Sequence, residues 1–251
     1  MNSRNFSLAE AAVAAIVVLM LGILLVPVIS RMRQASENTA CQGNLRQLGT
    51  LTLSYSSTNG GLLPALRTSY GVRWSDTLVD FKLGLPGQVP GALAGQSRQT
   101  AEAQYASLLR CPASTIKVQS NFGCTYAANP NAFGSKHNPG LMGMIQRPSE
   151  IIALGDANQN AQGNSACAFS WALRQRKYMM PDPSRRLPVD GRFAAGNQDG
   201  AAFIGKGDSG LRYRHYSNGP TSGAANVLLF DGHVDAMYLG GVREMNIATA
   251  Y

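Results

Sequence analysis

The first feature of the chain is a long apolar run near its beginning. Residues 6–29 form a stretch of 24 residues that carries a single charge, Glu10. At a rise of about 1.5 Å per residue, a helix of this length crosses a hydrocarbon core roughly 30 Å thick. A cleaved secretory signal has a shorter apolar core that ends in small residues, whereas this run ends in Leu24-Leu25-Val26-Pro27. The pattern therefore predicts a membrane helix that is retained.

After Pro27 the hydrophobic pattern becomes one-sided. Residues at spacings of three and four, or their sums, share one helical face, and the opposite face is polar. The positions on the first face are Met32, Ala35, Cys41, Leu45, Leu48, Thr52 and Tyr55. Pro27 bends a helix without necessarily ending it, and Asn59-Gly60-Gly61 is a strong stop signal. We therefore expect one helix from Phe6 to about Ser57, with its second half packed on a globular domain.

Local patterns predict shorter elements in the rest of the chain. These are helices near 74–82 and 99–109, a loop at 84–95, a buried strand at 151–155 and an irregular tail at 240–251. Residues 157–210 show little periodicity and form a long insertion. Gly205-Lys206-Gly207 within this insertion lacks the spacing of a phosphate-binding loop, which argues against a nucleotide site.

Residues 225–238 carry the clearest local signal outside the first helix. Two apolar runs flank Asp231-Gly232, a residue pair preferred in two-residue hairpin turns, in which both central residues adopt positive φ. The segment therefore predicts a β-hairpin with Asp231 and Gly232 at its tip.

Composition and charge add candidate partners to this picture. Charged residues make up 14% of the chain and Gly contributes 27 of 251 residues, so the domain should be rich in loops. A net charge of +8 favours anionic partners such as lipid headgroups or a polyanion. A basic cluster in the insertion, near Trp171 and Tyr178, is either a polyanion-binding segment or a solvated loop. Its residues are Arg174, Arg176, Lys177, Arg185 and Arg186.

The four cysteines favour disulfides over a metal site. An even number of cysteines beyond a membrane anchor suits an oxidising compartment. No closely spaced pair such as C-x-x-C is present, so neither zinc nor any other metal or cofactor is expected. We predict a Cys41–Cys111 bridge that ties the first helix to the domain, and a second bridge between Cys124 and Cys167.

The start of the chain resembles the N-terminus of type IV pilins and type II secretion pseudopilins. Arg4, then Phe6-Ser7-Leu8-Ala9-Glu10, and then the apolar run carry this resemblance. It implies that a prepilin peptidase cuts between Asn5 and Phe6, that the new amine of Phe6 is methylated, and that Glu10 and Pro27 serve assembly. The chain departs from the family at Asn5, where Gly is nearly always found.

Later segments extend the resemblance to a large pseudopilin-like family named for prepilin-type processing and a His…Asp-Gly motif. The C-terminal matches are Arg214-His215, Ala225-Asn226-Val227 and Phe230-Asp231-Gly232-His233-Val234. Further matches in the same order are Cys41 to Gly49, Leu109 to Pro112, Tyr126 to Asn129, and Arg147 to Glu150 followed by Asp156. The spacing from His215 to Asp231 is longer here than in the family motif.

The signature residues also raise the question of catalysis. His215, Asp231, His233 and Asp156 are of types that bind metals or transfer protons. Asp231 and Gly232 are already explained by the turn, and no nucleophile motif such as G-x-S-x-G is present. A calcium site at Asp190, Asp199 and Asp208 is not supported, because these residues do not have the spacing of an EF-hand loop. We therefore expect structural roles for the signature and no enzymatic activity.

Together these observations predict an α+β, pilin-like and loop-rich fold, with a long N-terminal helix packed on an antiparallel sheet. Its parts are a leader at 1–5, a transmembrane half-helix at 6–29, an amphipathic half at 30–58 and an extracytoplasmic domain at 59–251. The expected function is structural, as a fibre subunit or primer of a type II secretion or type IV pilus-like machine.

The expected location is the inner membrane, crossed once, with the C-terminal domain in the periplasm. The partners that the resemblance implies are inner-membrane lipid, prepilin peptidase and other pilin or pseudopilin subunits, and no small-molecule substrate is expected. The alternative is a membrane-anchored binding protein that holds a polyanion through the basic loop.

Overall fold

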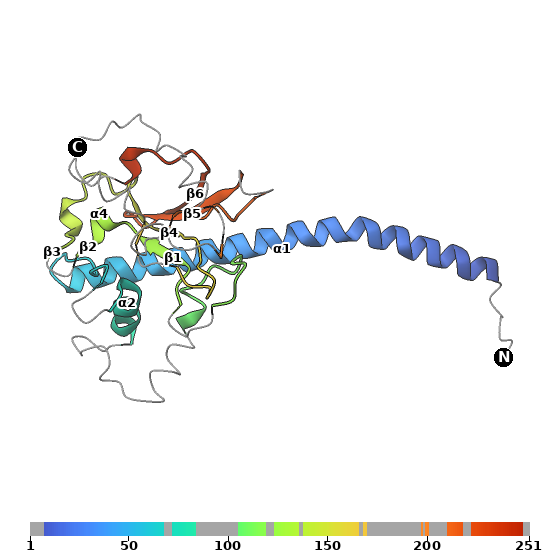
Figure 1. Cartoon of the computed structure of the whole chain (residues 1–251), viewed down its shortest axis with the longest axis horizontal. Coiled ribbons are helices and arrows are strands. Elements are labelled where there is room, and N and C mark those ends of the chain that lie inside the picture. The colour runs from blue at the N-terminus through green and yellow to red at the C-terminus, as the bar shows by residue number, and fades with distance from the viewer. Residues whose placement is uncertain are drawn as a thin grey trace.

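A computed structural model of the chain describes residues 8–67, 72–83, 105–118, 123–135, 138–165, 168–169, 197, 199–200, 210–217 and 222–247. It is an α+β structure in which one long helix, α1 (Leu8–Thr58), packs along an antiparallel sheet (Figure 1). This confirms the predicted fold class.

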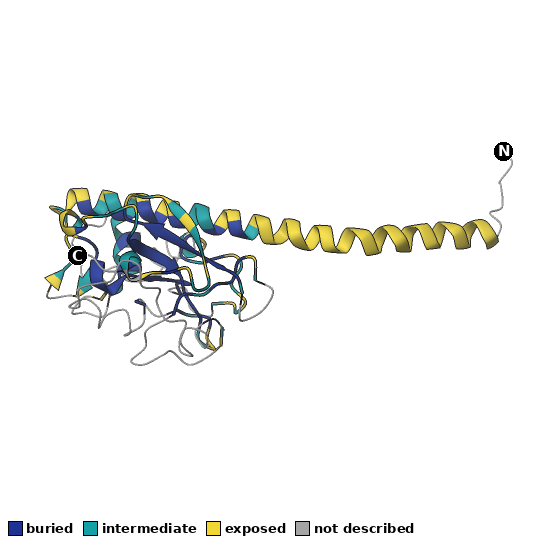
Figure 2. Cartoon of the chain, turned by 90° about the horizontal axis from the view of Figure 1, so that it is seen from above, coloured by how far each residue is buried: buried dark blue, intermediate teal, exposed yellow. Residues whose placement is uncertain are grey.

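The two halves of α1 have different surroundings. Residues 8–36 are exposed, and the buried positions are Asn38, Cys41, Leu45, Leu48, Gly49, Thr52 and Ser56. Figure 2 shows the buried positions confined to the part of α1 that lies in the domain. Met32 and Ala35 were expected on the packed face but are exposed, because the domain covers the helix only from about Asn38 onward. The helix ends one residue before Asn59-Gly60-Gly61, as predicted.

Four strands form the main sheet. They are β1 (Tyr126–Ala128), β4 (Ile152–Asp156), β5 (Ala224–Leu229) and β6 (Val234–Tyr238), in the spatial order β1-β4-β5-β6. All neighbouring pairs are antiparallel. The predicted strand at 151–155 corresponds to β4 within one residue. Strands β1, β4 and β5 are buried throughout, so this part of the sheet is covered on both faces, whereas β6 is partly exposed.

Alternation along β5 divides the core into two clusters. Leu228 and Phe230 join the cluster on the α1 side, together with Leu45 and Leu48. Val227 and Leu229 point to the other face and join a second cluster with Ile152 and Phe169. Because successive strand side chains point to opposite faces, one apolar segment serves both clusters.

The β5–β6 hairpin is present as predicted, but its turn differs. Leu229 N–H donates to the His233 carbonyl, so three residues, Phe230, Asp231 and Gly232, connect the strands. Gly232 has a φ of 94°, whereas Asp231 is not among the described residues with positive φ. The Phe230 and Asp231 N–H groups donate to Ile151 and Pro148. The predicted two-residue turn is therefore wrong, because Phe230 is drawn into the core and one residue is added to the loop.

The remaining helices, strands and turns of the described domain are short. They are α2 (Trp74–Lys82), which matches the predicted helix, α4 (Pro130–Phe133), β2 (Gly134–Ser135), β3 (Asn138–Pro139) and the 3₁₀ turns η1 (Met142–Met144) and η3 (Glu244–Asn246). The described part of the predicted tail is ordered, since Ile247 is buried and its carbonyl accepts hydrogen bonds from Asn129 and Asn131. The predicted loop at 84–95 and most of the predicted helix at 99–109 lie outside the described residues.

Candidate functional site

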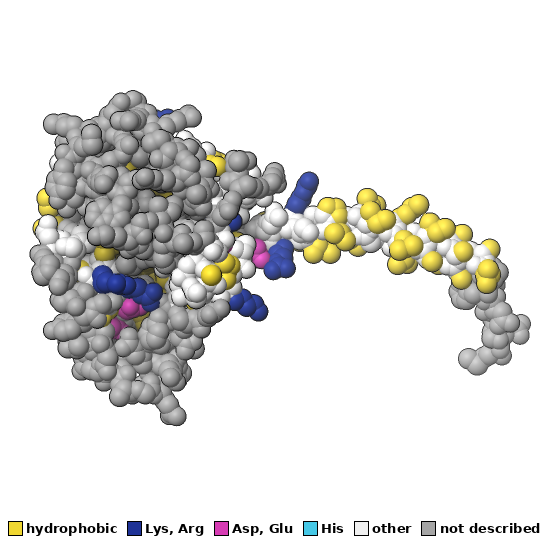
Figure 3. All heavy atoms as spheres, in the orientation of Figure 1, with side chains coloured by type: hydrophobic (Ala, Val, Ile, Leu, Met, Phe, Trp, Pro, Cys, Tyr) yellow, Lys and Arg dark blue, Asp and Glu magenta, His cyan; other side chains and the backbone are white. Residues whose placement is uncertain are grey.

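The apolar half of α1, defined as residues 8–29, is the first candidate site. Among the described residues, α1 is the one helix long and apolar enough to cross a membrane, by length and composition. Its most apolar window has a mean hydropathy of 3.1 and none of it is buried (Figure 3). Glu10 lies exposed in its first turn, and Pro27 lies within the helix near the end of this half. Asn5 and Phe6, the expected processing site, lie outside the described residues.

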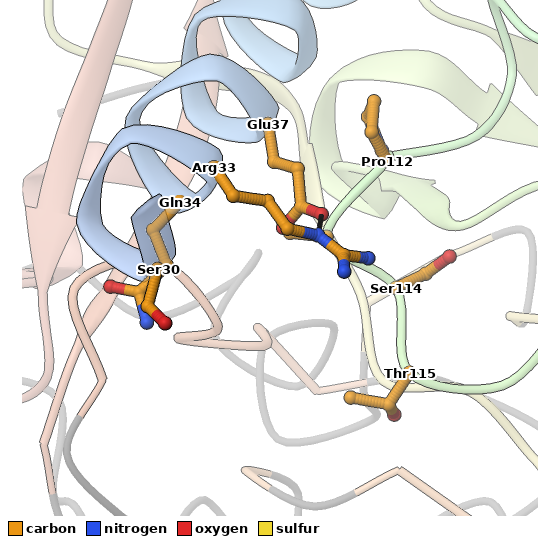
Figure 4. A pocket seen from close by; sticks show the side chains of 8 residues that line it. Ser30, Arg33, Gln34, Glu37, Pro112, Ser114 and Thr115 are labelled. Atoms are coloured by element: carbon orange, nitrogen blue, oxygen red, sulfur yellow. Dashed lines mark hydrogen bonds and ion pairs between the residues drawn. The ribbon is translucent and has the colours of Figure 1, made fainter. Parts of the chain in front are cut away.

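Polar residues follow directly after the apolar half. Arg31 and Arg33 are exposed, and Arg33 Nε donates to Glu37 Oε1 at 2.8 Å. An open pocket lies at this level between residues 30–37 of α1 and the loop at 112–115 (Figure 4). The α1 segment therefore changes from apolar to charged where the globular domain begins.

A buried group of chemically reactive side chains is the second candidate site. The cysteine cluster, as we call Cys41, Cys111, Asp156 and His215, brings one sulfur, nitrogen or oxygen atom from each residue within 4.8 Å of all the others. Cys41 comes from α1, Cys111 from the loop after residues 105–110, Asp156 from the end of β4 and His215 from a bridge to Ala224 of β5. All four residues are buried.

Hydrogen bonds connect the members of the cysteine cluster. The Cys41 thiol donates to Asp156 Oδ1 at 3.5 Å. Nε2 of His215 lies 3.0 Å from Asp156 Oδ2 and 3.4 Å from Cys111 Sγ. The Asn226 backbone N–H also donates to Asp156 Oδ2, at 3.0 Å. Asp156 therefore links α1, β5 and the segment that carries His215.

Burial and hydrogen bonding alter the acidity of the cluster. Burial opposes ionisation of Cys41, but hydrogen bonds with Cys111 and His215 outweigh it and lower the pKa of the Cys41 thiol to about 7. Burial and the hydrogen bond with Cys41 raise the pKa of Cys111. Burial disfavours charged His215, yet hydrogen bonds with Asp156 and Cys41 raise its pKa to about 9. The cluster therefore favours a thiolate at Cys41 over one at Cys111.

Two further polar side chains, Tyr126 and Arg214, lie against the cysteine cluster. The Tyr126 hydroxyl donates to Cys41 Sγ at 3.5 Å. Arg214 is buried, and its Nε lies 3.8 Å from Asp156 Oδ1. This Nε has no hydrogen-bond partner among the described residues. Arg214 also reaches Asp199, which accepts a hydrogen bond from Arg212 at 3.2 Å. The carboxylate of Asp199, one of the residues considered for calcium, is therefore paired with two arginines.

The expected Cys41–Cys111 disulfide is not present. The two residues lie 3.2 Å apart as free thiols, whereas a disulfide joins its sulfurs at about 2.05 Å. The prediction was right that these residues meet and wrong about the bond, since each sulfur instead takes part in polar contacts with Asp156 or His215. Cys124 is also buried. Its expected partner Cys167 lies outside the described residues, as do Arg174, Arg176, Lys177, Arg185 and Arg186.

The signature residues divide into two separate places. His215 joins the cysteine cluster, and no hydrogen bond or ion pair links it to Asp231 in the described part of the chain. Asp231 lies at the hairpin, where its Oδ1 is 2.6 Å from His233 Nδ1, and both side chains are partly exposed. The sequence singled out Asp156, His215 and both cysteines, but it did not reveal that Asp156 and His215 lie beside the two cysteines. The one available signal was that each of the four residues lies in a segment that carries the family resemblance.

Comparisons with known proteins found no family model, no curated protein and no solved structure that matches the chain.

Proposed function

We propose that this chain is a membrane-anchored, pilin-like subunit that assembles with other subunits through the apolar half of α1. The observation that carries the proposal is the contrast between the two halves of one continuous helix. The second half is packed on the sheet, whereas every described position of the first half is exposed. A helix that is apolar on all sides is unstable in water and has to be covered by lipid or by other helices.

The length of the apolar half supports a membrane anchor. Its 22 residues, Leu8 to Ile29, span roughly 33 Å as a helix, which is close to the thickness of a bilayer core. Arg31 and Arg33 follow at the level where headgroups would lie. The location in the inner membrane, and a periplasmic domain, rest on the resemblance to prepilins and belong to this proposal.

Glu10 supports assembly over simple anchoring. A carboxylate inside the bilayer costs about 3 kcal/mol, and an anchor gains nothing from it. In a staggered bundle of subunits, the amine of a processed Phe6 on one chain would meet Glu10 on its neighbour. Registers that leave Glu10 without such a partner would be disfavoured by roughly a hundredfold, because 1.4 kcal/mol corresponds to a factor of ten.

Crosslinking in the native membrane tests this role. A photo-crosslinking residue at Val18, an exposed position of the apolar half, reports contact between subunits. Glu10→Leu and the isosteric Glu10→Gln should abolish crosslinks to wild-type subunits, whereas Glu10→Asp, which keeps the charge, should retain them. Membrane extraction and thermal unfolding should be the same for all three variants.

Intact-mass analysis of the extracted protein tests processing. We expect a chain that begins at Phe6 and carries one methyl group. If the mature chain instead begins at Met1, and Glu10→Leu crosslinks as wild type does, the fibre role is wrong. The alternative, an anchored protein that binds a polyanion through the basic cluster, would then take its place.

A further inference from the structure

We propose that the cysteine cluster is a structural zinc site that fastens α1 to the globular domain. Two thiolates, one imidazole and one carboxylate are donors that zinc accepts in tetrahedral sites. The four residues are separated by 70, 45 and 59 positions along the chain, yet their donor atoms lie within 4.8 Å of one another. This site is independent of the assembly role proposed above.

The distances between donor atoms are close to those of a zinc tetrahedron. Zinc bonds of about 2.3 Å to sulfur and 2.0–2.2 Å to nitrogen or oxygen place donors roughly 3.4–3.8 Å apart. The distances are 3.2 Å between the cysteines and 3.4 Å from Cys111 Sγ to His215 Nε2. Asp156 Oδ2 lies 3.6 Å from Cys41 Sγ and 3.0 Å from His215 Nε2. For these four pairs, outward shifts of a few tenths of an ångström would reach the distances of a zinc tetrahedron. The other two pairs of donor atoms lie within 4.8 Å.

Charge balance also favours a divalent cation. Two thiolates and the Asp156 carboxylate carry three negative charges. A zinc ion and the buried guanidinium of Arg214 carry three positive charges, so the site is neutral when His215 is neutral. Arg214 Nε lacks a hydrogen-bond partner among the described residues and lies 3.8 Å from Asp156 Oδ1, where it offsets the charge of that ligand.

Hydrogen bonds from neighbouring groups would orient the ligands of such a site. The Asn226 N–H donates to Asp156 Oδ2, the oxygen that also lies 3.0 Å from His215, and so fixes the orientation of this carboxylate. The Tyr126 hydroxyl donates to Cys41 Sγ, which supports a thiolate there. Metal sites depend on groups of this kind to orient their ligands.

The burial of the cluster favours a structural ion over a reactive cysteine. Cys41 and Cys111 are 0% exposed, and the pocket of Figure 4 is lined by none of the four cluster residues. A catalytic zinc keeps an open position for water or substrate, whereas a structural zinc is enclosed by four protein ligands. The geometry therefore points to a closed site with a structural role.

Metal analysis of the full-length protein in detergent tests the site. The protein is purified without chelator or reductant, and about one zinc per chain is expected. His215→Gln, Cys41→Ser and Asp156→Asn should lose at least nine-tenths of this zinc. Matched changes outside the cluster, His233→Gln, Cys124→Ser and Asp231→Asn, should retain it. Tyr126→Phe should weaken zinc binding by about tenfold, because it removes the hydrogen bond from the Tyr126 hydroxyl to the Cys41 sulfur.

Two measurements keep the test valid if a ligand variant fails to fold. Chelation of wild-type protein should lower its unfolding temperature, and zinc chloride should restore it where magnesium chloride does not. Cobalt chloride added to the chelated protein should give the visible absorption of a tetrahedral thiolate complex. A purified chain without zinc whose mass shows a Cys41–Cys111 disulfide would overturn the proposal. So would a reduced chain that binds neither zinc nor cobalt.

Discussion

Gly49 of α1 lies directly against Leu228 of β5. A Cβ atom at Gly49 would approach Leu228 Cδ1 to 2.8 Å, closer than carbon atoms can pack. The absence of a side chain at Gly49 therefore lets the helix backbone come close to the sheet at the centre of the α1-side core. This contact makes the helix–sheet distance sensitive to one residue.

Gly49→Leu should destabilise the domain by about 1–3 kcal/mol, because the added side chain overpacks the contact with Leu228. Gly43 is a matched control, since it lies in the same helix with no atom within 4 Å of its Cβ position. Gly43→Leu should leave stability unchanged or increase it by up to about 1 kcal/mol, because Leu favours helix. Denaturant unfolding of both variants measures the difference, and equal effects at the two positions would contradict the close approach.

A chain of side-chain amides also joins α1 to the sheet. Asn226 Nδ2 of β5 donates to Asn38 Oδ1 at 2.8 Å, and Asn38 Nδ2 donates to the Tyr216 hydroxyl at 2.9 Å. Asn38→Ala should cost about 1–3 kcal/mol, because it leaves a buried amide of Asn226 without its acceptor. Gln47→Ala, on the exposed face of the same helix, should change stability by less than about 0.5 kcal/mol. A loss of similar size for both variants in denaturant unfolding would argue against the amide chain.

The helices and strands that were predicted correctly are those that a local sequence pattern determines. The apolar run and its one-sided continuation predicted α1, the short helix near Trp74 was recognised, and the run Ile151 to Gly155 predicted β4. Local periodicity does not tell where a domain begins to cover a helix, so Met32 was wrongly placed on the packed face. Strand β1 was missed because three residues are too few to show a period.

The cysteine cluster could not be predicted from local sequence patterns, and the reason is different. Its four residues lie on four segments that only the packing of the domain brings together. Metal sites are recognised in sequence by short spacings, and none of these residues is near another in the chain. The helix face of Cys41 correctly placed it against Cys111, but the nearby Asp156 and His215 changed the chemistry from a disulfide to a polar cluster.

The hairpin offers a test of the observed turn. Gly232 has a φ of 94°, which a β-branched residue adopts only with strain, so Gly232→Val should destabilise by about 1–3 kcal/mol. Gly143→Val is the matched control, because no atom lies within 4 Å of its Cβ position and its φ is not positive. Asp231→Asn should be nearly neutral, since Asp231 is at the surface and Asn also suits turns. A folded Asp231→Asn variant that loses co-assembly in the membrane would instead assign Asp231 to a functional site.

The ion pairs of Asp199 should make stability depend on pH. Burial raises the pKa of Asp199, but Arg214 and Arg212 outweigh it and lower the pKa below its ordinary value. Because the folded pKa is the lower one, this stabilisation is present above the unfolded pKa, about 3.9, and is lost as pH falls through the folded pKa. Asp199→Asn should therefore cost about 3 kcal/mol at pH 7, and the difference from wild type should shrink below about pH 4.

Asp235→Asn is the control for this pH dependence, because Asp235 lies exposed on β6. It should change stability by less than about 0.5 kcal/mol at either pH. Chemical denaturation at pH 7 and at acid pH measures both variants. A difference between Asp199→Asn and wild type that stays constant with pH would show that the arginine contacts do not stabilise the ionised carboxylate.

Removal of the apolar half tests whether the domain depends on it. Residues 8–36 are exposed, and burial of α1 begins near Asn38, so a chain that starts at residue 30 keeps every buried position of the helix. We expect it to be soluble without detergent and to unfold at the same temperature as the full chain in mild detergent. A chain that starts at residue 44 lacks Asn38 and Cys41 and should lose cooperative unfolding, because it removes the amide chain and one member of the cysteine cluster together. If the longer truncation unfolds like the shorter one, the first turns of the packed half add nothing to the domain. If the chain that starts at residue 30 fails to fold, the apolar half contributes to the fold as well as to the membrane.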